Sequence, residues 1–118
     1  MTEYTRPLGK TTIAPDVLLT IVRLAALSVP GVNRLTTIPG TANRIFKRPE
    51  NDGVKISVEN NTVYADVYMI VNKDVNVRDV CRNVQTQVSR AISEMVGMDV
   101  ARINIHVEDV EYDLLPEV

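Results

Sequence analysis

The stretch GVKISVENNTVYADVYMIVNK, residues 53–73, decides the fold because apolar and polar side chains alternate along it. With a period of two, successive side chains point to opposite faces of a strand, so one face is buried and the other is solvated. Asn60 and Asn61 separate two such runs, and Asn tolerates the positive φ angles of a two-residue hairpin turn. We predict antiparallel strands at 53–59 and 62–73. The side chains expected to point inward are Val54, Ile56, Val58, Val63, Ala65, Val67, Met69 and Val71.

After the hairpin, apolar residues recur at steps of three and four over 77–95, which is the spacing of an amphipathic helix. Asn76 is expected to cap the first turn of this helix, and Gly97 is expected to end it. Residues 100–110 then alternate again and predict a last strand. Its expected inward residues are Ala101, Ile103, Ile105 and Val107, and its expected outward residues are Arg102, Asn104, His106 and Glu108.

Before the hairpin, PDVLLTIVRLAALSVPGV (15–32) predicts a helix that begins at Pro15 and stops at Pro30 and Gly31. A short strand is expected at 11–13, and an extended segment at 32–38. Roughly 220° of the helical wheel carries no charge, whereas a surface helix usually needs an apolar stripe of about 100° or a little more. The helix therefore has more apolar surface than one sheet face requires.

This surplus apolar surface predicts an interface. If the arc centred on Ile21, Leu24 and Ser28 faces the sheet, part of the helix is left over for the loop 38–52, for the C-terminal tail, or for a second molecule. The outward tyrosines of the hairpin are a second candidate, since tyrosine is enriched at protein contacts, although half-exposed tyrosines on strands are common. The candidate interface residues are Leu19, Val22, Ala26, Val29, Tyr64 and Tyr68.

The expected order is β-α-β-β-β-α-β, an α+β fold with two helices packed on one face of a small mixed β-sheet. The 118 residues suit a single domain with one core over about 11–110. Tails are expected at 1–10 and 111–118, and a loop at 38–52.

No set of residues in the sequence predicts catalysis. His106 is the only histidine and is expected to be a half-exposed strand residue, and Cys81 is the only cysteine and is expected to be a small buried hydrophobe. No glycine motif for binding phosphate is present. The acidic residues are expected to form a solvated rim rather than a cation site. They are Glu108, Asp109, Glu111 and Asp113. We therefore predict no catalytic residues, no cofactor and no metal.

Nucleic acid and the membrane interior are also not expected as partners. The net charge is −2, and Arg44, Lys47 and Arg48 around Phe46 form only a small basic patch. The helix at 15–29 is shorter than the roughly 20 residues of a membrane span, and Arg23 lies within it. A cytoplasmic protein without direct membrane insertion is expected.

Three ordered stretches carry a family resemblance. IAPDVLLTIVRLAALSVPGV (13–32), GVKISVENNTVYADVYMIVNKDVNV (53–77) and RDVCRNVQTQVSRAISEMVGMDVARINIHVEDV (78–110) resemble the alkaline-shock and general-stress protein family of Gram-positive bacteria. Ala14 departs from the Ser that often precedes the first helix of that family. The family has no established catalytic residues to carry over.

The resemblance implies a non-enzymatic, self-associating protein of cell-envelope homeostasis or stress response. Such a protein is recruited near the inner face of the cytoplasmic membrane by a membrane-anchored partner. Since some family members occur beside a kinase that supplies acyl phosphates, the alternative is an accessory subunit or small-ligand carrier in fatty-acid or lipid metabolism. A third possibility is nucleic-acid binding through the patch at 44–48, with binding that depends steeply on salt.

Overall fold

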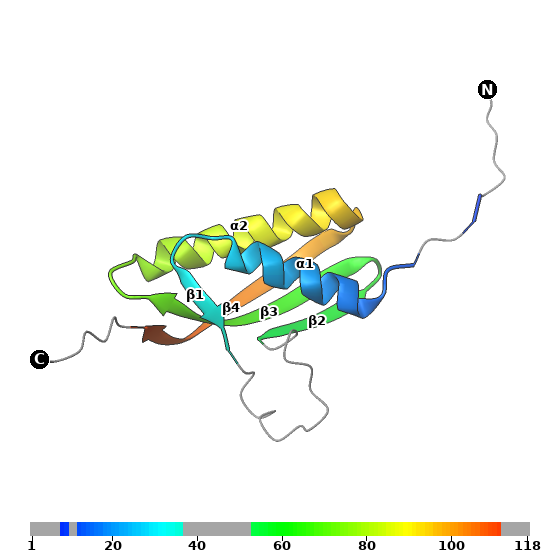
Figure 1. Cartoon of the computed structure of the whole chain (residues 1–118). Helices are drawn as coiled ribbons and strands as arrows, with labels where there is room; N and C mark the ends of the chain where they lie inside the picture. Colours follow the sequence, from blue (N-terminus) through cyan, green and yellow to red (C-terminus); the bar gives the residue numbers. More distant parts are fainter. Residues whose placement is uncertain (1–7, 10–11, 37–52, 112–118) are drawn as a thin grey trace, which may run out of the picture.

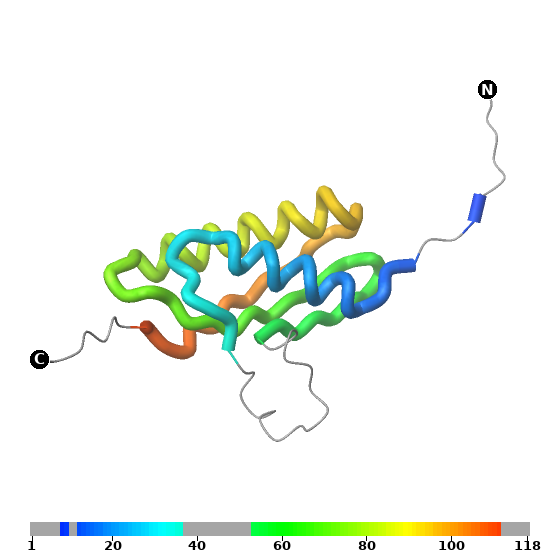
Figure 2. The backbone as a smooth tube through the Cα atoms, viewed as in Figure 1, coloured from blue at the N-terminus to red at the C-terminus, as the bar shows by residue number. Residues whose placement is uncertain are grey.

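The computed structural model describes residues 8–9, 12–36 and 53–111. Within these ranges the helices lie side by side over one face of the sheet (Figure 1), as predicted. The smooth trace of the backbone shows the same two layers (Figure 2). The elements are α1 (Pro15–Leu27), β1 (Val32–Leu35), β2 (Val54–Glu59), β3 (Thr62–Asn72), α2 (Val77–Val96) and β4 (Asp99–Glu111).

The predicted first strand is wrong over its described part, because residues 12 and 13 have irregular backbone and residue 11 lies outside the described ranges. Three residues carry too little periodicity to specify a strand. Ala14, directly before Pro15, is extended at φ −64° and ψ 142°, as the residue before a proline prefers. Ile13 instead lines a groove that is described below.

Strand β3 organises the sheet by pairing with all the others. β4 runs parallel to it along Thr62–Asn72, whereas β1 and β2 are antiparallel to it. Since β4 occupies one edge along the whole of β3, β1 and β2 share the other edge, end to end. They meet at Tyr68, whose carbonyl oxygen accepts from Thr36 N at 2.9 Å and whose N–H donates to Gly53 O at 2.7 Å. The predicted mixed sheet is confirmed.

The predicted turns and caps form with the expected chemistry. Asn60 and Asn61 have φ angles of 53° and 60°, and they join β2 to β3 in a two-residue turn. Asn76 Oδ1 accepts from Asp79 N at 3.1 Å at the start of α2. Gly97 ends α2 at φ 74°, in the left-handed conformation that glycine adopts without strain.

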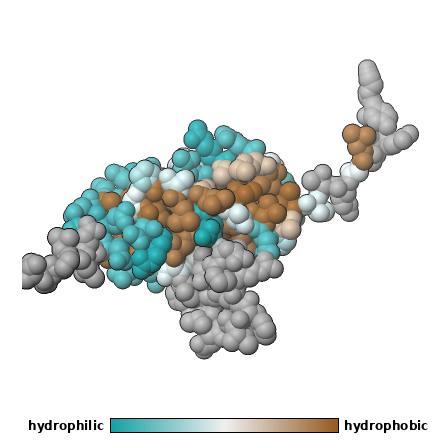
Figure 3. Space-filling view, viewed as in Figure 1, coloured by the Kyte–Doolittle hydropathy of each residue, from teal (hydrophilic) through white to brown (hydrophobic). Residues whose placement is uncertain are grey.

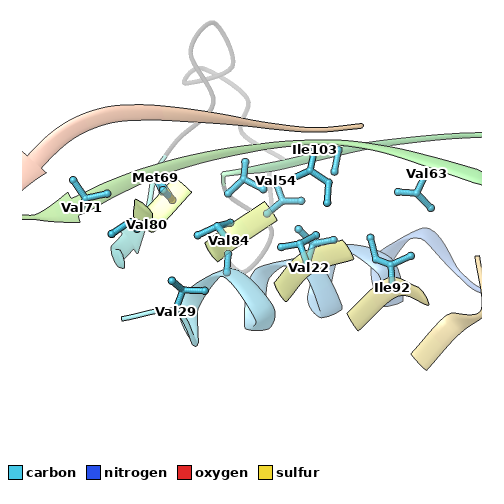
Figure 4. Close-up of a cluster of buried hydrophobic side chains, with 14 residues drawn as sticks. Val22, Val29, Val54, Val63, Met69, Val71, Val80, Val84, Ile92 and Ile103 are labelled. Carbon is cyan, nitrogen blue, oxygen red and sulfur yellow. The ribbon is translucent and has the colours of Figure 1, made fainter. Parts of the chain in front are cut away.

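The core lies between the helices and the inner face of the sheet (Figure 4). It takes Val22 and Ala26 from α1 and Val29 from just after the end of that helix, and their exposed fractions are 3% or less. Leu24 is 56% exposed, so the prediction that the arc around Ile21, Leu24 and Ser28 faces the sheet is wrong. The buried side chains that complete this cluster come from α2, β2, β3 and β4: Val80, Val84, Val88, Ile92, Val54, Val63, Ala65, Val67, Met69, Val71 and Ile103.

The register between β3 and β4 has two irregularities, and they interrupt the regular inward and outward alternation that was predicted for the last strand. The first lies between the pairs Val63–Val100 and Tyr64–Arg102, so Ala101 has no partner on β3 and is exposed rather than inward. The second leaves Glu108 without a partner in the same way. Such bulges place one extra residue in one strand of a pair. The predicted inward positions of Ile103, Ile105 and Val107 are confirmed, because they are aligned with buried residues of β3.

Candidate interaction surfaces

An apolar groove opens between the start of α1, strand β2 and the end of α2. Its volume is about 660 Å³. Val58 lies on the inward face of β2 as predicted, yet it is 45% exposed because it lines this groove. The lining residues are Ile13, Pro15, Leu18, Leu19, Val54, Ile56, Val58, Asn61, Val96 and Met98.

Further apolar side chains remain in water on α1. Val17 is 46% exposed and Leu24 is 56% exposed, and a separation of seven residues places them on one face of the helix. Apolar surface gathers along the α1 side of the molecule (Figure 3). Neither residue was among the predicted interface residues, because helical periodicity alone does not say which side of a wide apolar arc meets the core.

The predicted interface on α1 is wrong for Val22, Ala26 and Val29, which are buried in the core of the chain itself. The physical reason is that α1 packs against α2 as well as against β1 and β2, so two of its sides are covered. This double contact accounts for most of the wide apolar arc. Leu19 is half-buried and lines the groove, where its role as an interface residue stays a prediction.

Four polar side chains meet on the sheet face opposite the helices, and we call them the open-face cluster: Asp66, Tyr68, Asn104 and His106. The rings of Tyr68 and His106 stack with centroids 4.3 Å apart and planes inclined by 9°. Asp66 Oδ1 lies 3.1 Å from His106 Nε2 and accepts from Asn104 Nδ2 at 3.1 Å. The β3–β4 register creates this cluster, since it aligns Asp66 with Asn104 and Tyr68 with His106.

The cluster keeps the Asp66 carboxylate ionised. Partial burial raises the pKa of Asp66, but the hydrogen bonds with His106 and Asn104 and the electrostatic contributions of His106 and Lys55 outweigh that effect. The pKa of Asp66 therefore lies below its ordinary value. His106, with 38% of its side chain exposed, is the half-exposed residue that the alternation predicted. Its contact with Asp66 could not be predicted without the strand register.

The described residues do not assemble a nucleophilic site. Among them, no serine, threonine or cysteine side chain hydrogen-bonds to His106. Cys81 lies on α2 and is half-buried against the core, and burial raises the pKa of its thiol, which disfavours the reactive thiolate. Across ranges 8–9, 12–36 and 53–111, no three His, Cys, Asp or Glu side chains gather as a metal site would require.

The remaining predicted residues fall into three groups. Tyr64 and Tyr68 are half-buried on the open face, and their role in an interface stays a prediction. The basic patch at Arg44, Lys47 and Arg48 lies outside the described residues, as does Asp113. Of the acidic rim, Glu111 contacts Arg34 at 3.1 Å, and Asp109 accepts from the backbone N–H of Val110 at 2.8 Å.

Neither helix in the described part of the chain combines the length and the hydropathy that crossing a bilayer requires.

Comparisons with known proteins agree with this architecture. The uncharacterized protein YqhY of Bacillus subtilis (strain 168) is 31% identical over 108 residues, which are 90% of this chain and 80% of that protein. An uncharacterized protein of Streptococcus pyogenes serotype M6 is 32% identical over 117 residues, covering 98% of this chain and 88% of its own length.

A solved structure described as "MamM CTD - Copper form" superposes with a TM-score of 0.56 at 14% identity, over 88% of this chain and 91% of that one. That identity is low, so this match concerns the fold alone. Residues 3–112 match the profile of the alkaline-shock protein 23 family, which is described as having a cell envelope-related function. The chain belongs to this cell envelope-related family of Gram-positive bacteria.

Proposed function

We propose that this protein is a non-enzymatic interaction module of the cell envelope, which self-associates and is held near the cytoplasmic membrane by a protein partner. The observation that carries the proposal is the apolar groove of about 660 Å³ beside the start of α1. Ile13 and Val58, which line it, are 39% and 45% exposed. Partly exposed apolar side chains gathered around a concave surface favour a binding site for another molecule.

The occupant that fits this groove best is an amphipathic segment of the partner. Its walls come from a helix, a strand and a helix end, and nearly all the lining side chains are aliphatic. Apolar side chains spaced along one face of a partner helix or strand would fill such a groove, with polar contacts at its rim. The family's cell envelope-related function supports a partner at the membrane.

The test compares variants in cells. Val58→Glu places a charge in the groove at an exposed position, so the fold tolerates it while an apolar partner segment does not. Val77→Glu is the matched control, since Val77 is 37% exposed and lies at the first position of α2, where an acidic residue suits the helix dipole. Wild type and Val77→Glu should co-sediment with membranes, whereas Val58→Glu should not. Equal co-sedimentation of all three contradicts the proposal.

The groove also supports a second candidate, a carrier of a small apolar ligand. Its volume lies within the range of about 300–1,000 Å³ that is typical of ligand sites. Native mass spectrometry of protein purified from cells separates the two candidates. A bound lipid-like mass that disappears in Val58→Glu would favour the carrier, and an unmodified chain mass would favour the interaction module.

A further inference from the structure

The strand β4 leaves one edge of the sheet without a strand partner among the described residues. It has 13 residues, and it pairs with β3 along one side only. An unpaired edge presents a row of backbone N–H and C=O groups that another strand can bind. Proteins usually protect long edges with bulges, charges or side-chain caps, so the parts of β4 that lack such protection identify where a partner strand fits.

On the open edge of β4, side chains hydrogen-bond to the backbone at two places. The segment of β4 between these two places is a short window whose edge is free of such contacts. Gln85 Nε2 of α2 donates to Ile103 O at 3.0 Å, and Asp109 Oδ1 accepts from Val110 N at 2.8 Å. Backbone groups alternate in direction along a strand. Since the carbonyl of Ile103 points to the open edge, the N–H and C=O groups of Ile105 and Val107 point there as well.

The bulges confine regular pairing to the same window. They fall at Ala101 and Glu108, and residues 102–107 keep an uninterrupted register with β3 between them. Regular backbone with outward N–H and C=O groups therefore extends from Ile103 to Val107. A partner strand meets five regular residues there, with the centre at Ile105.

The charged side chains at the two ends of this window have opposite signs, so the edge is complementary to the same edge of a second copy in antiparallel orientation. Arg102 lies at the start of the window, beside a shallow groove of about 720 Å³ that Arg82 and Arg90 of α2 also line. Glu108 and Asp109 lie at the other end of the window. An antiparallel pair of identical strands related by a two-fold axis at Ile105 aligns residue 102 of each copy with residue 108 of the other. Each Arg102 would then face an acidic side chain.

We propose that a second copy of this chain pairs antiparallel with the open edge of β4 around Ile105, joining two four-stranded sheets into one. The inference rests on the self-association within the proposed function, but it uses a surface separate from the apolar groove. The same register places Asn104 of each copy opposite His106 of the other on the open face. The two open-face clusters would then be contiguous across the two-fold axis.

The test exploits the symmetry of this contact. Arg102→Glu creates two acidic pairs in its own dimer, and Glu108→Arg creates two basic pairs, so each variant alone should raise the dimer dissociation constant by about tenfold or more. In an equimolar mixture of the two variants both pairs become attractive, and dimers should return. Arg23→Glu makes the same change of charge on α1, which packs on α2, β1 and β2, and should leave the dimer intact.

Sedimentation velocity measures these masses, and circular dichroism checks that each variant is folded. A wild-type dimer that neither variant weakens, or a mixture that stays monomeric, overturns the pairing at β4 and leaves membrane recruitment through the groove untouched. A monomeric wild type overturns both the pairing and self-association. Hydrogen exchange gives an independent readout, since the amides of Ile105 and Val107 should exchange more slowly as protein concentration rises. Exchange that is independent of concentration contradicts the proposal.

Discussion

Thr36 and Gly53 hydrogen-bond to the same residue, Tyr68, one through its carbonyl oxygen and the other through its N–H. The chain leaves the sheet after Thr36 and returns to it at Gly53, so β1 and β2 act as two parts of one edge strand. On the opposite edge of β3 the parallel partner β4 brings His106 beside Tyr68. Tyr68 therefore connects the junction of β1 and β2 with the open-face cluster.

Gly53 should not tolerate a side chain. Its φ is +88°, and a Cβ there would lie 2.8 Å from Leu35 Cβ and 2.9 Å from Tyr68 O. Gly53→Ala should lower the free energy of unfolding by about 2 kcal/mol or more, since it adds backbone strain to a steric clash. Urea denaturation measures the change. Gly97→Ala is the matched control, because Gly97 also has a positive φ, +74°, but nothing lies within 4 Å of a Cβ at that position, so this variant has the backbone strain without the clash.

The Asp66 carboxylate should make stability depend on pH. The pKa of Asp66 is lower in the folded chain than in the unfolded chain, so the ionised carboxylate stabilises the fold. This stabilisation is fully present above the pKa of the unfolded chain, about 4, and it is lost as the pH falls through the pKa of the folded chain. Asp66→Asn should cost about 1 kcal/mol at pH 7 and progressively less below about pH 4. Thermal unfolding of both proteins at several pH values measures this, and a difference that is independent of pH contradicts it.

The two sides of α1 should respond differently to truncation. Val22→Ala removes two methyl groups from a fully buried site and should cost about 2 kcal/mol, whereas Leu24→Ala, at a side chain that is 56% exposed, should change stability by less than about 0.5 kcal/mol. Chemical denaturation of the two variants tests the orientation of the helix. A larger cost at Leu24 than at Val22 would show that α1 is rotated from the orientation described.

Asn76 should contribute to stability through its cap on α2. Removing its side-chain acceptor leaves Asp79 N unpaired, so Asn76→Ala should cost about 1 kcal/mol, and Asn76→Asp should retain most of the stability. Equilibrium unfolding compares the two variants. Equal losses for both would indicate that the cap itself contributes little.

Local signals predicted most of the fold. The Asn60–Asn61 turn, the Asn76 cap and the glycine end of α2 each depend on a few neighbouring residues, so the sequence was sufficient to locate them. The orientation of α1 depends on the position of α2, and the inward face of residues 100–102 depends on a bulge specified by pairing with β3. No periodicity in the sequence encodes either relationship.

The same distinction holds for the candidate sites. That Tyr68 and His106 point away from the core follows from alternation, and both predictions hold. The stacking of the two rings and the hydrogen bond from Asn104 to Asp66 both depend on the parallel register of β3 and β4. A whole helix separates these two strands along the chain, so local patterns do not reveal the register. The groove combines residues from three separate segments of the chain, and for this reason only Leu19 among its lining residues was predicted as a site residue.

The central claim is that the apolar groove binds a membrane-associated protein, and site-specific photocrosslinking in living cells tests it most directly. A photoreactive amino acid at Val58, inside the groove, should crosslink to one membrane-anchored protein, whereas the same probe at Val77 should not. If the probe at Val58 yields no more crosslinked membrane protein than the probe at Val77, the groove does not serve as the docking site and the account is contradicted.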